Sequence, residues 1–166
     1  SVDFQLSAAR EALLSDINFD RFYLKLGSGH AFSTKHLLHA RMELGWIESK
    51  DFDQVPLSLR FFAGGDDSIR GFARREVSPQ DADGNAIGGR YLTTLSTEYE
   101  YRLRESLGLA VFVDAGRAGY NEYDPIAYGG GFGLRWYSPV GPIKLYIGVP
   151  LKGDDKSARF HLSVGN

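Results

Sequence analysis

Residues 95–116 read LSTEYEYRLRESLGLAVFVDAG, and this stretch decides the fold. In its first part, polar side chains such as Glu98 alternate with leucine, threonine and tyrosine. In its last part, valines alternate with Phe112 and Asp114. Because successive side chains of a strand point to opposite faces, this period of two predicts two β-strands. The short turn at 104–106 makes them antiparallel, with Glu98 and Asp114 on one polar face.

The same alternation recurs along the rest of the chain and predicts about eight strands in total. No long window shows a competing helical period. Proline and glycine between two of these segments, at 138–141, supply the geometry of a short turn. The predicted strands cover residues 2–8, 22–27, 38–46, 95–101, 109–115, 132–136, 143–151 and 160–164.

The chain has 166 residues, a net charge of −2, no cysteine and 13% aromatic residues. This length favours a single domain. A charge near zero gives no reason to expect nucleic acid as a partner, and without cysteine there is no disulfide or thiolate site. No apolar run approaches the roughly 18–20 residues of a membrane helix. Residues 1–10 lack a basic stretch followed by an apolar one, which predicts a cytosolic, processed or excised chain.

A membrane-spanning β-barrel is the fold that this pattern favours. Each crossing takes roughly 9–11 residues, so the chain accommodates about eight crossings. Soluble sandwiches and lipocalin-like barrels also alternate, but here the second face is charged on strand after strand. A charged face suits a water-filled lumen better than a soluble core. Aromatic residues near the strand ends fit an interfacial girdle: Trp46, Tyr99, Tyr101 and Trp136.

One connection, at about residues 49–90, is far longer than the others and shows no alternation. Connections of this length are usually functional or disordered. In outer-membrane barrels the long loops face the outside of the cell and the short turns face the periplasm. We therefore expect residues 49–90 to form an extracellular loop. An even number of strands then puts both ends of the segment at the periplasmic rim.

Four motifs follow one another in this loop and in the strands after it: FFAGG at 61–65, IRGF at 69–72, FVDAG at 112–116 and SPVGP at 138–142. In this order they resemble the BamA/TamA superfamily of outer-membrane insertases and two-partner secretion transporters. IRGF is similar to the loop motif of that family, and FVDAG is similar to its strand motif. The run 59–72 and the SPVGP turn are most similar to TamA-like members.

The resemblance covers the chain from about residue 57 onward and implies a larger fold. Family barrels have about sixteen strands, so this chain resembles the second half of one. The implied function is the insertion or translocation of outer-membrane proteins, autotransporters in particular, in a Gram-negative bacterium. It implies no bond chemistry and no cofactor. The implied partners are outer-membrane lipid, client proteins and an inner-membrane TamB-like protein, which is reached through periplasmic POTRA modules that these residues do not contain.

The resemblance also implies that the long loop folds back into the lumen, where Arg70 meets acidic residues of the barrel wall. Glu98 and Asp114 lie on the inward face, so Arg70 can bind two carboxylates in a partly desolvated lumen. The alternative is an arginine that caps an exposed loop. Glycines allow the tight backbone that docking needs. The residues of the loop motif, its turn and the strand motif are Ile69, Arg70, Gly71, Phe72, Phe61, Phe62, Gly64, Gly65, Phe112 and Gly116.

The last predicted strand alternates Phe160, Leu162 and Val164 with polar residues. Outer-membrane barrels are recognised for assembly through such a final strand, which usually ends in an aromatic residue. This chain ends in Gly165 and Asn166 instead. TamA-like chains commonly run a few residues further, so we expect a shortened tail.

No constellation of catalytic or metal-binding residues emerges from the sequence. His36 and His39 are three apart, which on a strand puts them on opposite faces. The acidic runs 66–67 and 81–85 lack the spacing of a calcium loop. The glycine run 129–133 precedes no helix, so it is not a phosphate loop. On a barrel wall these glycines permit close approach or curvature. We therefore expect neither an enzyme nor a metal site.

Two other functions and two ways of closing the barrel stay open. A stand-alone small outer-membrane barrel would have a structural or adhesion role, and a two-partner or patatin-type secretion transporter would share the fold. An eight-stranded barrel is nearly filled by its own side chains, so a loop docked inside needs a wider ring. We therefore expect either a homodimer of two half-barrels that closes head to tail, or a self-closed barrel with the loop outside.

Overall fold

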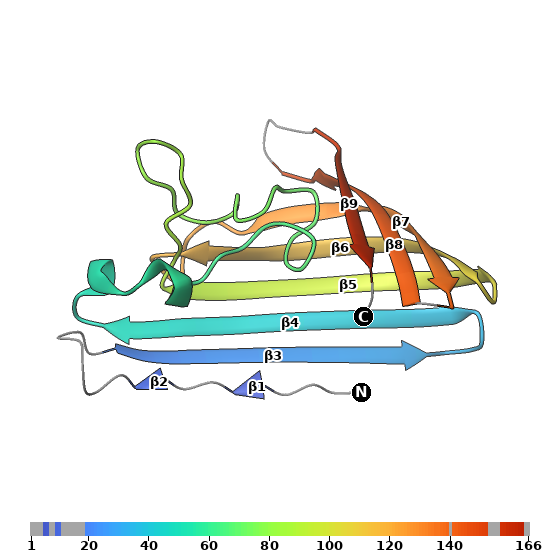
Figure 1. Cartoon of the computed structure of the whole chain (residues 1–166), viewed down its shortest axis with the longest axis horizontal. Coiled ribbons are helices and arrows are strands. Elements are labelled where there is room, and N and C mark those ends of the chain that lie inside the picture. The colour runs from blue at the N-terminus through green and yellow to red at the C-terminus, as the bar shows by residue number, and fades with distance from the viewer. Residues whose placement is uncertain (1–4, 7–8, 11–18, 140, 153–156, 165–166) are drawn as a thin grey trace.

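The computed structural model describes residues 5–6, 9–10, 19–139, 141–152 and 157–164. Within them the chain forms one antiparallel sheet with the order β1-β3-β4-β5-β6-β7-β8-β9, and β2 also pairs with β3 (Figure 1). The strands are β1 (Gln5–Leu6), β2 (Ala9–Arg10), β3 (Phe19–Ala31), β4 (His36–Ser49), β5 (Tyr91–Arg104), β6 (Leu107–Gly119), β7 (Ala127–Ser138), β8 (Gly141–Pro150) and β9 (Arg159–Val164).

This topology confirms the antiparallel all-β fold that the alternation predicts. Each expected strand from residue 22 onward corresponds to one of β3 to β9. The weak strand expected at 2–8 lies partly outside the described residues, and β1 and β2 are two short pieces that both pair with β3. Among the described strands, β9 pairs only with β8, so the sheet does not close on itself.

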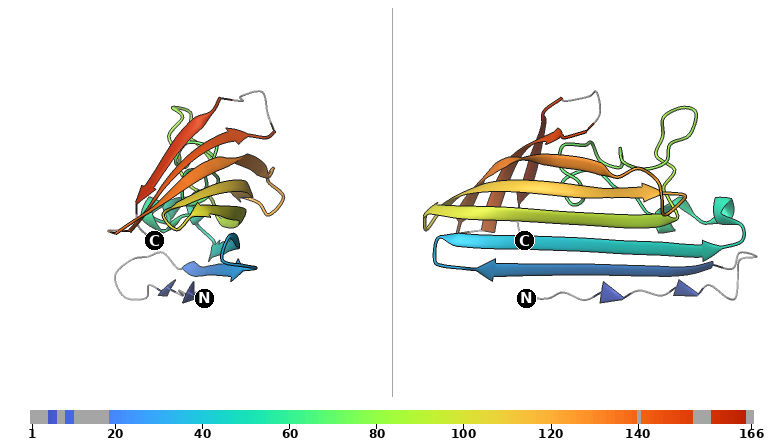
Figure 2. Two further views of the ribbon diagram at one scale, coloured as in Figure 1. Left: turned by 90° about the vertical axis from the view of Figure 1, so that its right-hand side faces the viewer. Right: turned by 180° about the vertical axis from the view of Figure 1, so that it is seen from behind.

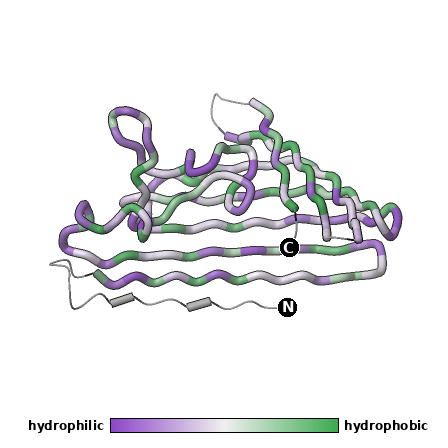
Figure 3. Tube along the Cα trace, in the orientation of Figure 1, coloured by the Kyte–Doolittle hydropathy of each residue, from purple (hydrophilic) through white to green (hydrophobic). Residues whose placement is uncertain are grey.

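The register puts the polar face of every strand on the same side of the sheet. Asp114 lies opposite Ser96, and Glu98 lies opposite Phe112, across the β5–β6 pair. Asp114 is 0% exposed, whereas its neighbour Val113 is 55% exposed. Along the strands, hydrophilic and hydrophobic residues follow one another in short alternation (Figure 3). The sheet therefore has an outward apolar face and an inward face that is polar around Glu98 and Asp114.

Aromatic side chains gather on the outward face near both ends of the strands. Phe22 and Trp46 stack with ring centroids 5.4 Å apart near one rim. His36 packs beside Tyr99 and Tyr101 near the other rim. Rings at both ends of an apolar band are the arrangement of the interfacial girdles of outer-membrane barrels.

Residues 50–90, the docked loop, lie over the concave face of the sheet (Figures 1 and 2). The loop contains the 3-10 turns η1 (Phe52–Gln54) and η2 (Leu57–Leu59). An antiparallel bridge joins Phe61 to Gly89, which lies next to the end of the loop. Within the described parts of the chain, no helix has the length and apolarity needed to span a membrane. The expected folding of the loop toward the inner face is confirmed.

A hydrophobic core holds the docked loop on the wall. Phe61 fills the space over Gly45 of β4, where a Cβ atom would lie 2.5 Å from the phenyl ring. Burial of a large apolar side chain contributes roughly 1.5–3 kcal/mol, so several such anchors favour the docked position. The buried cluster takes Phe19, Ile47, Leu92 and Ala118 from the strands and Phe52, Val55, Phe61, Ala63 and Ile69 from the loop.

Candidate functional site: the tip of the docked loop

The tip of the docked loop, residues 64–72, is a compact turn. Gly64 and Gly65 both have positive φ, 105° and 103°, a backbone region that favours glycine. The amide of Gly65 donates to the carbonyl of Ile69 at 3.2 Å, and the amide of Gly64 donates to the hydroxyl of Ser68, also at 3.2 Å. This turn directs the residues after it, starting with Ile69, at the concave wall.

Arg70 binds Asp114 of β6 through three hydrogen bonds. The backbone amide of Arg70 donates to Oδ2 at 2.9 Å, Nε donates to the same oxygen at 2.8 Å, and Nη2 donates to Oδ1 at 2.9 Å. Ser96 of β5 supports the pair: its hydroxyl donates to Asp114 Oδ1 at 2.6 Å and accepts from Arg70 Nη2 at 3.1 Å. Bidentate contacts of this kind combine strength with a fixed geometry.

Glu98 of β5 is the second carboxylate partner of Arg70 and binds its Nη1. Arg70 is 4% exposed, and burial by itself would lower its pKa. The hydrogen bonds and negative charges of Asp114 and Glu98 more than offset this effect and raise the pKa of Arg70 above its ordinary value. The guanidinium therefore keeps its charge inside the sheet. The structure thus brings together Arg70, Glu98 and Asp114, the three residues that the family resemblance implies to be in contact.

The guanidinium of Arg70 also stacks on aromatic rings of the wall. Its Cζ atom lies 3.6 Å from the ring centroid of Phe112 and 4.7 Å from that of Tyr146. The two rings meet edge to face, with centroids 5.6 Å apart. A desolvated cation over a ring gains about 2 kcal/mol or more. The phenylalanine of the strand motif thus contacts the arginine of the loop motif directly.

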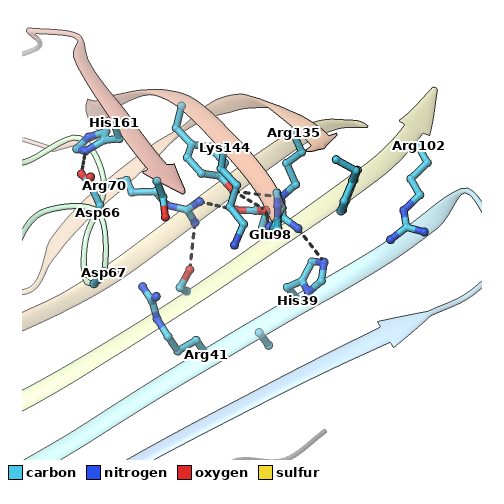
Figure 4. A pocket seen from close by; sticks show the side chains of 16 residues that line it. His39, Arg41, Asp66, Asp67, Arg70, Glu98, Arg102, Arg135, Lys144 and His161 are labelled. Atoms are coloured by element: carbon cyan, nitrogen blue, oxygen red, sulfur yellow. Dashed lines mark hydrogen bonds and ion pairs between the residues drawn. The ribbon is translucent and has the colours of Figure 1, made fainter. Parts of the chain in front are cut away.

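A second arginine extends this network along the wall. Arg135 of β7 binds Glu98 through Nη2 and donates to Glu100 from Nη1 at 2.7 Å. Tyr146 of β8 donates to Glu98 at 3.0 Å. Glu98 therefore lies between two arginines, as the dashed lines of Figure 4 show for the labelled side chains. The alternating charges offset the cost of burying each one.

Glycines on β7 and β8 let the loop tip come within contact distance of the wall. A Cβ on Gly129 would lie 1.9 Å from the carbonyl oxygen of Arg70, and one on Gly148 would lie 2.7 Å from the amide nitrogen of Gly71. Gly71 itself has a φ of 96°, and a Cβ there would lie 2.8 Å from the backbone of Val149. The wall and the tip therefore fit backbone against backbone, with no room for side chains.

The other motif residues take supporting positions. Phe72 packs against the hydrophobic core under the loop. Phe62 is half-buried and lies under the guanidinium of Arg75, with 4.3 Å between Cζ and the ring centroid. Gly116 of β6 leaves room for β5, because a Cβ there would lie 2.5 Å from the carbonyl oxygen of Thr93. The alternating residues of β9 are exposed on the outward face: Phe160, Leu162 and Val164.

Four residues of the site were not predicted from the sequence: Ser96, Arg135, Tyr146 and His161. Ser96 and Tyr146 carry no signal beyond their inward position. Arg135 is the single charged residue in the glycine-rich segment 129–136, and an isolated charge on an inward stripe is a signal for a buried partner. His161 is one of the inward residues of the last predicted strand, and the sequence gives no sign that its ring contacts the loop tip.

The contacts of the site hold the loop tip against the inner wall. Among the described residues, no group of three or more histidine, aspartate or glutamate side chains is placed to hold a metal ion. His36 and His39 lie on opposite faces of β4. His36 packs on Tyr99 on the outward face, and His39 contacts Glu100 on the inward face. A cavity of about 500 Å³ beside the network is lined mainly by charged and polar side chains from the strands and the loop tip.

Comparison with known proteins agrees with this architecture. The Omp85 superfamily domain matches residues 1–166. The outer membrane protein assembly factor BamA of Nitratidesulfovibrio vulgaris is 33% identical over 162 residues, which cover 90% of this chain and 20% of that protein. The chain thus spans about a fifth of the length of this relative.

Two solved structures share the fold. The crystal structure of BamA from Haemophilus ducreyi lacking POTRA domains 1–3 superposes with a TM-score of 0.79 and 21% identity, over 95% of this chain and 36% of that one. CdiB from Acinetobacter baumannii superposes with a TM-score of 0.62 and 18% identity, over 98% of this chain and 30% of that one. The domain match and the fold confirm the family resemblance of the motifs: the chain belongs to the Omp85 superfamily and is a segment of a BamA/TamA-type outer-membrane β-barrel.

Proposed function

We propose that this chain forms the C-terminal half of an outer-membrane barrel that inserts other barrel proteins into the outer membrane of a Gram-negative bacterium. The observation that carries the proposal is the docked loop, whose Arg70 is bound by Glu98 and Asp114 on the inner wall. A buried charge network of this kind costs desolvation and is retained where it fixes one conformation. The relative with 33% identity is named an outer membrane protein assembly factor, which supports the same activity.

Within this activity, a TamA-like role is the finer proposal. It rests on the run 59–72 and on the turn that begins at Ser138, both of which resemble TamA-like members. The clients would then be autotransporters, and the partner would be an inner-membrane TamB-like protein. That partner would be reached through POTRA modules that lie outside these residues. Outer-membrane lipid would contact the outward apolar face, which includes Val113 and Trp136.

An assembly assay tests the proposal. The full-length protein that carries this chain is reconstituted into vesicles of outer-membrane lipid, and the insertion of an autotransporter barrel is followed by its protease protection. We expect the native protein to accelerate insertion, Asp114→Ala to remove most of the acceleration, and Arg74→Ala, an exposed loop arginine, to leave it intact. Equal rates in vesicles with and without the native protein would overturn the proposal.

Secretion of an unfolded polypeptide is the second candidate function. The resemblance of the motifs to a superfamily that includes two-partner secretion transporters supports it. The two functions differ in the fate of the client, which stays in the membrane after insertion but crosses it after secretion. A client that carries both a barrel and a passenger segment therefore separates them. If transfer of the passenger across the membrane depends on this protein but insertion of the barrel does not, the secretion role replaces the assembly role.

The closure of the barrel is a further part of the proposal. Because the described strands form an open sheet, either more strands of a longer chain or a second copy would have to complete a ring with room for the loop. For the 166-residue chain we favour a head-to-tail homodimer. The mass of the protein in detergent, corrected for bound detergent, tests this: a monomer with a protease-resistant loop would contradict it. A self-closed small barrel with a structural or adhesion role would instead expose the loop.

A further inference from the structure

We propose that His161 is a positioning residue that fastens the tip of the docked loop to the last strand, β9. The ring of His161 joins two loop residues, Asp66 and Gly71, from the strand side. Through this bridge the position of the loop and the position of β9 become one linked equilibrium. The inference goes beyond the proposed function, because it concerns how two parts of the sheet are held together and does not depend on any client.

The geometry of the bridge is specific. The backbone amide of Gly71 donates to Nε2 of His161 at 3.0 Å, and Nδ1 on the other side of the ring contacts the carboxylate of Asp66. The side chain of His161 is only 5% exposed, whereas that of Asp66 is 42% exposed. Figure 4 shows the ring beside Asp66, with Arg70 close by in the same loop tip. The ring therefore fills the space between the strand and the tip.

The two partners fix the state of the ring. A backbone amide can only donate, so Nε2 of His161 must carry the lone pair. A carboxylate can only accept, so Nδ1 must carry the proton. The neutral ring with its proton on Nδ1 is the one form that satisfies both Gly71 and Asp66. Protonation of Nε2 would turn an acceptor into a donor and break the contact with Gly71.

The last strand is held by backbone pairing and by side-chain contacts with the loop. β9 is six residues long and, among the described strands, pairs with β8 alone. The inward side chains of β9 contact the loop. His161 is one of them, and Arg159 is another, which forms an ion pair with Glu76 at 3.2 Å. A strand of this length forms few ladder hydrogen bonds, so its side-chain contacts weigh more in its order. A contact from the loop therefore adds to the order of β9.

Coupling between two sites is reciprocal. If docking of the loop stabilises β9 through His161, then release of Arg70 from its carboxylates must loosen β9 as well. The same bridge must transmit loosening of β9 back to the amide of Gly71. This reciprocity separates a positioning residue from a side chain that merely fills space.

Two substitutions divide the bridge into its halves. Gln in place of His161 keeps an acceptor at the ε position, within reach of the Gly71 amide. Asn ends one atom earlier, so it keeps a group near Asp66 and loses the contact with Gly71. Ser163→Ala alters another inward residue of β9 and serves as the matched control. Amide hydrogen exchange of Gly71 and of the β9 backbone is measured in the full-length protein in lipid nanodiscs.

We expect H161N to speed exchange of the Gly71 amide and of the β9 amides about fivefold, the effect of one lost hydrogen bond. H161Q should stay close to the native rates, and Ser163→Ala should change neither region. In the native protein, ¹⁵N shifts of the His161 ring should report a proton on Nδ1 and none on Nε2. If H161N does not fold, Asp66→Ala, a change in an exposed loop residue, removes the other half of the bridge. The amide of Gly71 still needs the lone pair of Nε2, so the ring should keep its proton on Nδ1, and a proton on Nε2 in this variant would overturn the bridge.

Equal Gly71 exchange in H161N, H161Q and the native protein would overturn the bridge. A ring with its proton on Nε2 in the native protein would also overturn it. If H161N speeds exchange of the Gly71 amide but leaves exchange of the β9 amides unchanged, the hydrogen bond is local and does not couple the loop to β9. That result would also overturn the proposal. None of these readouts involves client insertion, so they leave the proposed function to its own test.

Discussion

Asp114 holds Arg70 by its backbone as well as by its side chain. One carboxylate oxygen accepts from both the main-chain amide and Nε of Arg70, at 2.9 and 2.8 Å, although the two residues lie 44 positions apart. The main-chain contact fixes the path of the loop, and the guanidinium contacts then anchor it on Glu98 and on the ring of Phe112. The loop tip is thus held in one position by several different kinds of contact.

Removal of either member of this pair should release the loop. Arg70→Ala or Asp114→Ala leaves a buried charge without its partner, which typically costs about 3–5 kcal/mol. We expect the docked loop to become sensitive to proteinase K in both variants, with Arg74→Ala as the control. A loop that stays resistant in both would show that the hydrophobic core alone holds it.

Arg70→Lys should weaken docking without abolishing it. Lysine keeps the charge and the backbone amide, but its ammonium group cannot reproduce the fork that binds Asp114 and Glu98 together. We expect proteolysis of the loop at a rate between those of the native protein and Arg70→Ala. Native resistance in this variant would mean that charge alone is sufficient.

Glu98→Gln should be milder than Asp114→Asn. Arg70 keeps its contacts with Asp114 when Glu98 is neutralised, and Arg135 keeps Glu100. The double variant should deviate from additivity by about 0.5–3 kcal/mol, because both carboxylates bind the same guanidinium. Urea unfolding of the four proteins in lipid vesicles measures this coupling, and strict additivity would contradict a shared network.

Gly129→Ala should disturb the site although it adds a single methyl group. The new Cβ would lie 1.9 Å from the carbonyl oxygen of Arg70, so the loop tip must shift. Overpacking of this kind costs about 1–3 kcal/mol. The control is Gly27→Ala in β3, where a Cβ meets no atom within 4 Å. Equal stability and equal loop resistance of the two variants would refute the close fit.

Val113→Arg tests whether the outward face meets lipid. Val113 is 55% exposed in the middle of β6, and an arginine at the midplane of a bilayer costs about 2–4 kcal/mol on such a barrel. Tyr123→Arg, in the connection between β6 and β7, should cost close to nothing, because that side chain is 86% exposed beyond the strands. The free energy of unfolding in vesicles measures both, and a harmless Val113→Arg would contradict a lipid-facing side.

Much of the fold is local information. The alternation in residues 95–116 assigns strands and faces by itself, because side chains change sides at every residue of a strand. For the same reason the inward position of Glu98 and Asp114 follows from the sequence, as does the outward position of Val113. The order of the loop and strand motifs then suffices to indicate the family.

The contacts of the site are not local. The pairing of Ser96 with Asp114 and the wedge of Arg135 between Glu98 and Glu100 depend on the register of three neighbouring strands, and a shift of one residue would reverse every face. No period in the sequence encodes that register. His161 lies 90 positions after Gly71 and accepts a hydrogen bond from the Gly71 backbone amide. The sequence gives no sign of this contact.

The sequence by itself therefore determined the strands, their two faces, the long loop and the family of the chain. Only the tertiary structure decided which side chains meet, which glycines, such as Gly129 and Gly148, make room for the loop tip, and that β9 is tied to it. The physical reason is the separation along the chain over which each property is set. Strand periodicity depends only on neighbouring residues. The fit of a loop against a curved wall depends on the register and curvature of the whole sheet.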